Sequence, residues 1–439
     1  MWTKMRFGRI VAAALVLSAG SCGEPNQRKT TSQPVAETEE SSPSAAVAVP
    51  ADHSAPFEPP QLLTREEIDS GWISLFDGHS LFGWQPNSEA NWEVRDGALR
   101  AEGGNSGLLL TRVPFGNFEL RFDIWLEQGG NSGVFLRTPF DPEDPSRDCF
   151  EFNVCDSHPD FPTGSIVGRQ RVEQVVAGEG DWKSFHLRLE GSGLEATCEG
   201  EPVITFSDRS DTPLESGLIG LQVRSGSVEF RNVFLKPLGM NHLFNGNDLT
   251  GWQVVPGSKG SFEVVDGGIH VQGGSGFLET ENIWANFILQ AEARTNVEKI
   301  NGGIFFRAMR GTEEAPSNGY ELQIHNGFEG EDRTKPNDYG TGFGTGAIFR
   351  RQKARRIVAD DLDWCTITLV AHGADFASWV NGYQVTSWTD EREPHENPRR
   401  GRRDEAGHLS LQGHDATSDL TFRDLQISEI PKSVPLAAN

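Results

Sequence analysis

Apolar and polar residues alternate along most of the chain with a period of two. Clear examples are NFELRFDIWL (117–126), SFHLRLEG (184–191), GSVEFRNVFL (226–235) and TITLVAHG (366–373). This period places successive side chains on opposite faces of a β-strand, and Gly, Asn, Asp and Pro between such segments are typical turn residues. One stretch, TREEIDSGW (64–72), predicts a turn or two of helix. The pattern therefore predicts all-β domains built as two-sheet antiparallel sandwiches of the jelly-roll type.

The same ordered set of sequence blocks occurs twice. LFDGHSLFGW (75–84) returns as LFNGNDLTGW (243–252), and NSGVFLR (131–137) returns as NGGIFFR (301–307). Five further pairs keep this order: WEVRDGAL and FEVVDGGI, FEFNVCD and YELQIHN, PTGSI and GTGAI, GDWKSFHLRL and LDWCTITLVA, and GLIGLQVRSGSVEFRNVFL and GHLSLQGHDATSDLTFRDLQI. The spacing of about 170 to 190 residues is too long for a solenoid unit. We therefore expect two copies of one domain, over 66–237 and 238–433.

The segment before the repeats predicts export. A basic region precedes the apolar run IVAAALVLSA (10–19), and small residues lead to Cys22. This is the pattern of a lipoprotein-type signal peptide over 1–22 with Cys22 as the lipidated residue, and ordinary secretory cleavage nearby is the alternative. Residues 23–65 are rich in Pro, Ser, Ala and Glu and predict a disordered tether. We expect a lipoprotein anchored through Cys22 in a bacterial outer membrane or at the cell surface, with the periplasm as an alternative.

The charge limits the partners. The formal net charge is -24 and the sequence pI is near 4.9. A protein this acidic is a poor match for a phosphate backbone, so nucleic-acid partners are disfavoured. Neutral ligands such as sugars remain open. The basic stretch RRQKARR (350–356) is either a solvated loop or a grip for an anionic sugar.

The cysteines give little further constraint. Cys149 and Cys155 lie in what the pattern predicts as one strand, too far apart to bond to each other. Cys198 could pair with either of them, and nothing in the sequence requires it. There is no CxxC or Cys/His zinc pattern.

The strand NGYELQIH (318–325) has an unusual polar face. Its apolar residues occupy one face, and Glu321, Gln323 and His325 share the other. The default interpretation is a strand with one face in water. The alternative is that these side chains line a pocket.

The repeated blocks resemble the 3-keto-disaccharide hydrolase domain family. The resemblance is carried by LFNGNDLTGW, FEVVDGGI, NGGIFFR, GYELQI, TGAIF, DW…VNG and LQGH…FRDLQI, and it covers nearly all of 70–237 and 240–430. It implies a concanavalin-like jelly-roll fold, shared with lectins and glucanases. It also implies cleavage of glycosides whose sugar is oxidised to the ketone at carbon 3, with an oligosaccharide or modified sugar as the ligand.

That substrate class defines what the site must contain. A ketone at C3 acidifies the proton on C2, so a base can remove it and form an enolate. The bond from C1 to the leaving oxygen then breaks, and water adds back. Such a site needs a base near C2 and a cationic or hydrogen-bonding group at the ketone oxygen. It does not need the paired carboxylates of a conventional glycosidase.

In the second copy, the resemblance places the site on the polar strand and two further blocks. Glu321 or His414 is expected as the base, and Arg307 or a metal as the group that stabilises the enolate. A divalent cation held by Glu321, His325 and His414 is one option, although the family often has Asp near His325. The residues expected to bind the sugar are Asn301, Gln323, His325 and Gln412.

The first copy departs from this pattern. Asn153 replaces the Gln, Cys155 stands in place of the His, and Arg224 replaces the His of the last block. An arginine does not release its proton near neutral pH, so a candidate acid or base is lost. We expect a weakened or binding-only domain, whose candidate binding residues are Arg137, Glu151, Asn153 and Gln222. The alternative function for the whole chain is a non-catalytic carbohydrate-binding surface lipoprotein.

Overall fold

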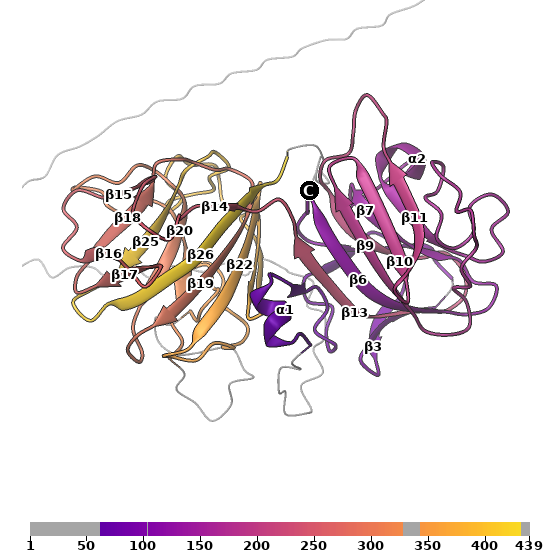
Figure 1. The fold of residues 1–439 in the computed structure, drawn as a ribbon, viewed down its shortest axis with the longest axis horizontal. Coiled ribbons are helices and arrows are strands. Elements are labelled where there is room, and N and C mark those ends of the chain that lie inside the picture. Colours follow the sequence, from indigo (N-terminus) through magenta and orange to yellow (C-terminus); the bar gives the residue numbers. More distant parts are fainter. Residues whose placement is uncertain (1–61, 103, 328–342, 432–439) are drawn as a thin grey trace, which may run out of the picture. The chain divides into compact units, whose positions relative to one another are not determined.

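Two β-sandwiches make up the part of the chain that the computed structural model describes, residues 62–102, 104–327 and 343–431. The all-β jelly-roll prediction is confirmed: each sandwich has two antiparallel sheets face to face (Figure 1). The predicted signal peptide, Cys22 and most of the tether lie outside the described residues. None of the helices in the described ranges has the length and apolar character needed to cross a membrane.

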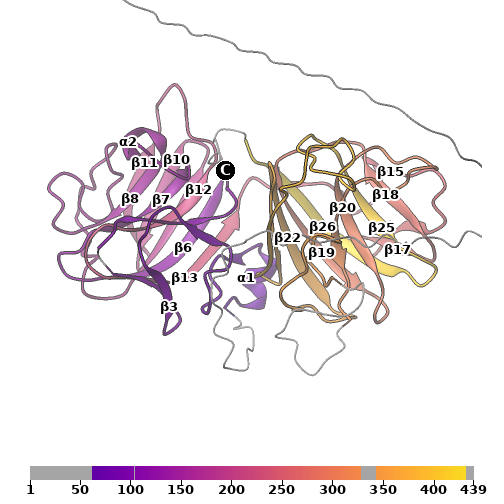
Figure 2. The ribbon, with the colours of Figure 1, turned by 180° about the vertical axis from the view of Figure 1, so that it is seen from behind.

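The first sandwich pairs an eight-stranded sheet with a five-stranded one. The larger sheet has the order β11 (Glu201–Ser207), β10 (Gly193–Cys198), β9 (Lys183–Glu190), β6 (Phe118–Leu126), β13 (Val228–Pro237), β4 (Ala98–Ala101) and β3 (Trp92–Arg95), with β1 (Ile73–Ser74) on β13. The smaller sheet has the order β2 (Trp84–Pro86), β5 (Gly107–Thr111), β12 (Leu218–Val223), β7 (Ser132–Thr138) and β8 (Phe150–Val154). Figure 2 shows β12, β7 and β8 from behind.

The second sandwich repeats this topology strand for strand. Its larger sheet has the order β16 (Ser261–Val265), β17 (Gly268–Gln272), β26 (Asp419–Glu429), β19 (Phe287–Thr295), β22 (Trp364–His372), β23 (Asp375–Val380) and β24 (Tyr383–Thr389), with β14 (Asn241–His242) on β26. Its smaller sheet has the order β15 (Trp252–Val254), β18 (Gly276–Thr280), β25 (His408–Gly413), β20 (Gly302–Ala308) and β21 (Tyr320–Ile324). The repeated topology explains why the sequence blocks recur in one order.

The two described helices are short. Helix α1 (Arg65–Asp69) falls within the predicted stretch, and the Glu67 N–H donates to the Thr64 hydroxyl while the Glu67 carboxylate accepts from the Thr64 N–H. This reciprocal cap stabilises the first turn. Helix α2 (Pro145–Asp148) precedes β8.

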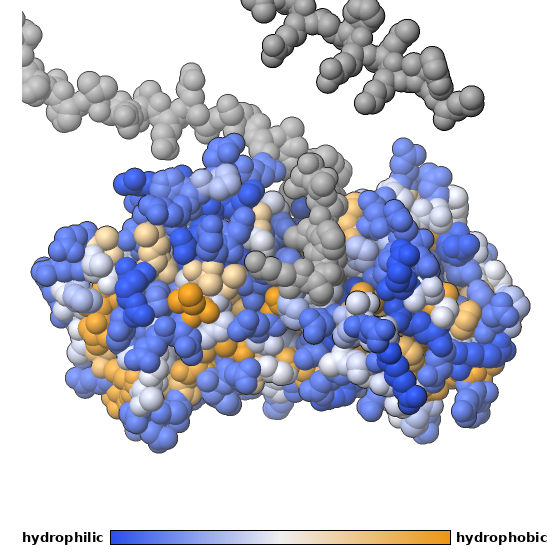
Figure 3. Space-filling view, turned by 90° about the horizontal axis from the view of Figure 1, so that it is seen from above, coloured by the Kyte–Doolittle hydropathy of each residue, from blue (hydrophilic) through white to orange (hydrophobic). Residues whose placement is uncertain are grey.

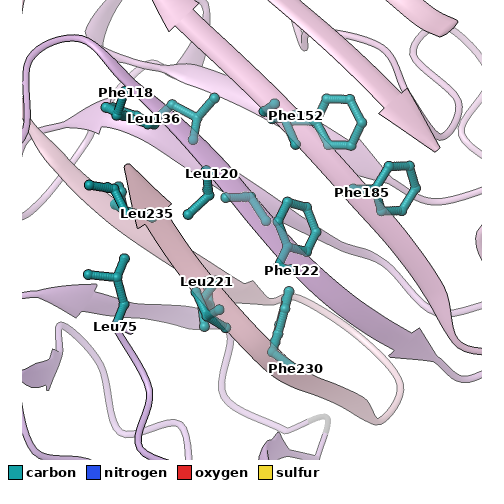
Figure 4. Close-up of a cluster of buried hydrophobic side chains, with 14 of the residues drawn as sticks. Leu75, Phe118, Leu120, Phe122, Leu136, Phe152, Phe185, Leu221, Phe230 and Leu235 are labelled. Carbon is teal, nitrogen blue, oxygen red and sulfur yellow. The ribbon is translucent and has the colours of Figure 1, made fainter. Parts of the chain in front are cut away.

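The hydrophobic core of the first sandwich follows from the alternation of its strands. In β6, Phe118, Leu120, Phe122, Ile124 and Leu126 are buried, whereas the residues between them are partly exposed. Aromatic rings from β8, β9 and β6 meet in this layer, as Figure 4 shows. The period-two pattern therefore encodes the inner face of the sandwich directly.

One hairpin in the larger sheet of each sandwich has a two-residue turn. The β10–β11 and β23–β24 hairpins turn at Glu199–Gly200 and Asn381–Gly382, with positive φ at all four residues, as a type I′ turn requires. The four cysteines in the described ranges are buried free thiols: Cys149, Cys155, Cys198 and Cys365.

The face in Figure 3 is dominated by hydrophilic residues, with hydrophobic ones in smaller groups between them.

Candidate active site

The candidate site lies on the outer face of the smaller sheet in the second sandwich. Gly303 of β20 pairs with Gln323 of β21 on one side and with Gln412 of β25 on the other. Two residues further along β20, Phe305 pairs with Glu321. Residues two apart share a face of a strand, and the residues between these belong to the core. The register therefore places the two amides and the carboxyl group together.

Gly303 places no side chain between the two amides, and we call this position the gap. A Cβ atom at Gly303 would lie 3.1 Å from the Cγ of Glu321 and 3.4 Å from its Oε1, so this carboxyl group lies over the glycine. The Oε1 atoms of Gln323 and Gln412 are buried without a hydrogen-bond partner in the part of the chain that the structure describes. Such atoms cost stability, and they can accept bonds from the hydroxyl groups of a sugar. The amide nitrogen of Gln323 donates to Asn301 Oδ1 at 2.7 Å.

The polar face of β21 is not turned to water. Glu321, Gln323 and Gln412 are only 5%, 1% and 8% exposed. The default interpretation of a wet strand face is therefore wrong for these residues. Polar groups are rarely buried on a sheet face unless neighbouring segments or a ligand satisfy them.

Glu321 has the properties of a base suited to neutral pH. Burial raises the pKa of this carboxyl group from 4.5 to about 7, against the opposing effect of nearby basic side chains, chiefly Arg399 and then His414. The Nη2 atom of Arg399 lies 3.3 Å from Glu321 Oε2, and its guanidinium lies 5.1 Å from the centre of the Phe305 ring. A carboxyl group and a cation thus lie together at the gap, as proton abstraction beside a carbonyl requires.

The loop that carries Arg399 is fixed to the strand that carries Glu321. The hydroxyl of Tyr320, on the core side of β21, donates to Asp390 Oδ2 at 2.7 Å and accepts from the Arg403 N–H at 2.9 Å. The Nη2 atom of Arg351 donates to the Arg399 carbonyl at 2.9 Å. These bonds hold both ends of the loop and so position the Arg399 side chain.

Sequence reasoning missed Arg399. It lies in the charged run 390–405, between β24 and β25. Neither periodicity nor spacing relates it to Glu321, because the loop approaches the sheet only through tertiary contacts. The Arg399 side chain is partly exposed, as are other charged side chains of this loop, so its exposure does not single it out.

Arg307 is not part of this site. It is fully buried, and its guanidinium donates to the carbonyls of Ala285, Gly373 and Arg403 at 2.7, 2.6 and 2.9 Å. Its guanidinium also lies 5.2 Å from the ring centre of Phe376, a core residue. The predicted role for Arg307 in stabilising an enolate is therefore wrong. Arg137 is likewise buried in the first sandwich and donates to backbone carbonyls, so its predicted role in binding sugar does not fit either.

A substitution separates a structural from a catalytic role for Arg307. We expect Arg307→Met to lower the free energy of unfolding by at least about 3 kcal/mol, because several buried carbonyl groups lose their donor. Arg137→Met should have a similar effect in the first sandwich. Urea unfolding followed by intrinsic fluorescence measures both. Normal stability of Arg307→Met together with lost activity would contradict this assignment.

The two predicted histidines lie at the end of the site. His414 directly follows β25, and its Nδ1 lies 2.9 Å from Asp415 Oδ2 with about half of its side chain exposed. His325 directly follows β21, and its Nδ1 lies 2.9 Å from the Ile300 carbonyl. Within the described ranges, no three His, Cys, Asp or Glu side chains are grouped so that they could hold a metal ion. The predicted option of a cation held by Glu321, His325 and His414 is therefore not supported.

The first sandwich contains an equivalent gap. Gly133 pairs with Asn153, and a Cβ atom at Gly133 would lie 3.5 Å from Gln222 Oε1 and 3.6 Å from Glu151 Cγ. Burial raises the pKa of Glu151 to about 7, and Gln222 Nε2 donates to its Oε1 at 3.3 Å. The core elements of the site are therefore duplicated.

The surroundings of the two gaps differ. Beside Glu151, Leu108, Leu110 and Phe135 belong to an apolar cluster. Phe277 and Phe305 take the places of Leu108 and Phe135 in the second sandwich, so the difference lies at Leu110. In the second sandwich the residue in place of Leu110 is Glu279, which pairs with Arg310 at 3.0 Å. No ion pair joins Glu151 to a cation in the described ranges. Glu151 therefore lacks the counterpart of Arg399.

A separate cavity of about 560 Å³ lies in the second sandwich. Glu281, Ile283, Trp284, Arg310 and His408 contribute to its lining. None of the candidate site residues lines it.

Comparison with known proteins agrees with the resemblance in the sequence. The model of a family described as the 3-keto-alpha-glucoside-1,2-lyase-like domain matches residues 71–236 and 239–428. The chain belongs to this family. Both copies match, so the tandem arrangement predicted from the repeats is confirmed. A search of the curated proteins finds no match.

Two solved structures match parts of this chain. A "putative glycosyl hydrolase" from Parabacteroides distasonis ATCC 8503 is 23% identical over 40% of this chain and 98% of its own, with a TM-score of 0.36. The carbohydrate binding module CBM66 from Bacillus subtilis is 17% identical over 35% of this chain and 95% of its own, with a TM-score of 0.30. Each match covers less than half of this chain.

Proposed function

We propose that the protein cleaves glycosides whose sugar carries a ketone at carbon 3, with Glu321 of the second sandwich as the base. The observation that carries this proposal is a buried carboxyl group with a pKa of about 7, held over a glycine gap between two amides and beside Arg399. Membership of the 3-keto-alpha-glucoside-1,2-lyase-like domain family supports the substrate class.

The proposed reaction uses these groups in order. The Glu321 carboxylate takes the proton from C2, and the electrons of that C–H bond form an enolate with its charge on the C3 oxygen. Arg399 is the cation that can stabilise this oxygen. The enolate then collapses, the bond from C1 to the leaving oxygen breaks, and that oxygen takes up a proton. Water adds across C1 and C2 and gives the free 3-keto sugar.

The neighbouring polar groups fit supporting roles. The unpartnered Oε1 atoms of Gln323 and Gln412 can accept hydrogen bonds from hydroxyl groups of the ring. His414, which Asp415 holds through Nδ1, is half-exposed and suited to exchange a proton with the leaving oxygen or with water.

The pH dependence of aglycone release tests the proposal. Because the carboxylate is the active form of a base, kcat/KM for an aryl 3-keto-glucoside should rise with pH through about 7 and fall on the acid side. The parent glucoside without the ketone should release no aglycone, since its C2 proton is not acidic. A rate that falls as pH rises through 7, or equal cleavage of the parent glucoside, would contradict the proposal. Binding without release would favour the non-catalytic alternative.

We also propose that the protein is exported and anchored through Cys22. The basic region, apolar run and small residues before Cys22 support this. Mass spectrometry of the mature N-terminus in a bacterial host should find a lipid-modified Cys22, and Cys22→Ser should shift the protein from the membrane to the soluble fraction. An unmodified N-terminus elsewhere would indicate ordinary secretory cleavage.

A further inference from the structure

A second arginine lies in a turn that is bound to the strand of Glu321. The turn after β21 is bound to that strand, because the Phe349 N–H donates to the Glu321 carbonyl at 2.9 Å and Ile348 forms a β-bridge with Leu322. Arg350 follows directly in this turn. Its side chain is exposed, and its guanidinium lies 5.3 Å from the centre of the Phe349 ring. No ion pair joins it to an acidic group in the part of the chain that the structure describes.

The backbone conformation of Arg350 is unusual for an arginine. Its φ is 60°, in the left-handed region that residues with a Cβ adopt at an energetic cost. In the first sandwich, Ile166 makes the bridges that Ile348 makes in the second, so Gly168 is the residue equivalent to Arg350. Gly168 has a φ of 70°, which glycine adopts freely. At this position the second sandwich has an arginine with a strained backbone, whereas the first sandwich has a glycine without strain. Such strain is typical of functional positions.

The charge at this rim is opposite to that of the whole chain. The net charge of the chain is -24, yet the neighbouring groups that lower the pKa of Glu321 are basic side chains: Arg399, His414 and Arg350. Two acidic residues of the nearby loop pair with arginines, Asp390 with Arg392 and Asp404 with Arg402.

Arg350 and Arg399 have separate surroundings. Arg399 is bound to Glu321 and partly buried, whereas Arg350 is exposed and makes no ion pair within the described ranges. We infer that the second sandwich binds glycans with an acidic substituent, a carboxylate or a sulfate ester, and that Arg350 binds this group at the rim of the gap. This inference rests on the proposed function and names its substrate class. A planar guanidinium suits both kinds of anion through paired hydrogen bonds.

Binding of three matched ligands to the full chain tests the inference. Phenyl glucoside, phenyl glucuronide and phenyl glucoside 6-sulfate differ only in charge and substituent, and calorimetry at low salt gives their Kd values. We expect at least one acidic ligand to bind about tenfold more tightly than the glucoside, the effect of one charge-assisted hydrogen bond. The acidic ligand that binds more tightly shows whether the site prefers a carboxylate or a sulfate ester. High salt should reduce the preference.

Two variants assign the effect. Arg350→Gly installs the residue of the first sandwich and relieves the backbone strain, so it should fold normally and lose the preference. Arg224→Gln removes an exposed arginine near Glu151 of the first sandwich and should keep the preference. Equal Kd values for the three ligands, an unchanged preference in Arg350→Gly, or the same loss in Arg224→Gln would overturn the inference. Release of aglycone from a neutral 3-keto-glucoside, measured in parallel, shows separately whether the proposed function stands.

Discussion

Replacing Glu321 by Gln is expected to lower kcat for aglycone release from a 3-keto-glycoside by about 10²- to 10⁴-fold, the contribution of a general base. The amide keeps the size of the side chain but cannot take a proton from C2. Burial of this side chain leaves little room for water to replace it as the base. Aglycone release is measured at saturating substrate at pH 8, where the wild-type carboxylate is ionised. The two rates give the ratio of kcat for the wild type to kcat for the variant directly.

The first sandwich supplies the matched control for this variant. Glu151 is as buried as Glu321 and has a similarly raised pKa, but it lacks a paired arginine. If the second sandwich is the active one, Glu151→Gln should leave most of the release rate intact. A larger loss in Glu151→Gln than in Glu321→Gln would place the reaction in the first sandwich instead.

Replacing Arg399 by Gln is expected to lower kcat by about 10²- to 10³-fold, as for removal of a group that stabilises an oxyanion. It should also shift the pH profile. Arg399 is the chief cation that lowers the pKa of Glu321, so its loss should move the acid limb of kcat/KM to higher pH. The two effects together distinguish a cation at the reacting atoms from one that only shapes the loop.

Arg400 is the control for Arg399. It is the next residue in the same loop and is exposed, and no salt bridge joins its side chain to an acidic group in the described ranges. Arg400→Gln should therefore leave both the rate and the pH profile close to wild type. Equal losses in the two variants would indicate a general effect of loop charge and would contradict the role of Arg399.

Much of the fold was accessible from the sequence because it depends on local periodicity. The alternation in 117–126 predicts both the strand β6 and which of its faces is buried. The same reasoning places Glu321 and Gln323 on one face of β21, and the repeat shows that a carboxyl group recurs at Glu151. Periodicity could not show that this face is covered, because the covering segments lie far away in the sequence.

Arg307 shows how local reasoning about a site can fail. It ends the block that contains Gly303, so simple alternation would turn it to the same face as Phe305. The pairing of β20 with β25 shifts register between Phe305 and Ala308, and Arg307 has a φ of 47°. A bulge of this kind turns a side chain to the other face. The arginine therefore enters the interior, and a loop residue, Arg399, occupies the place expected of it.

The fate of the C2 hydrogen tests the central claim most directly. In the proposed reaction this proton leaves, and water later supplies its replacement, so cleavage in D₂O should yield a 3-keto sugar with deuterium at C2. Mass spectrometry and NMR of the product at early times measure this, with Glu321→Gln and the isolated product in D₂O as controls for spontaneous exchange. We predict deuterium at C2 in step with aglycone release by the wild type. Release of the aglycone with the original hydrogen kept at C2 would contradict abstraction by Glu321 and indicate direct displacement at C1.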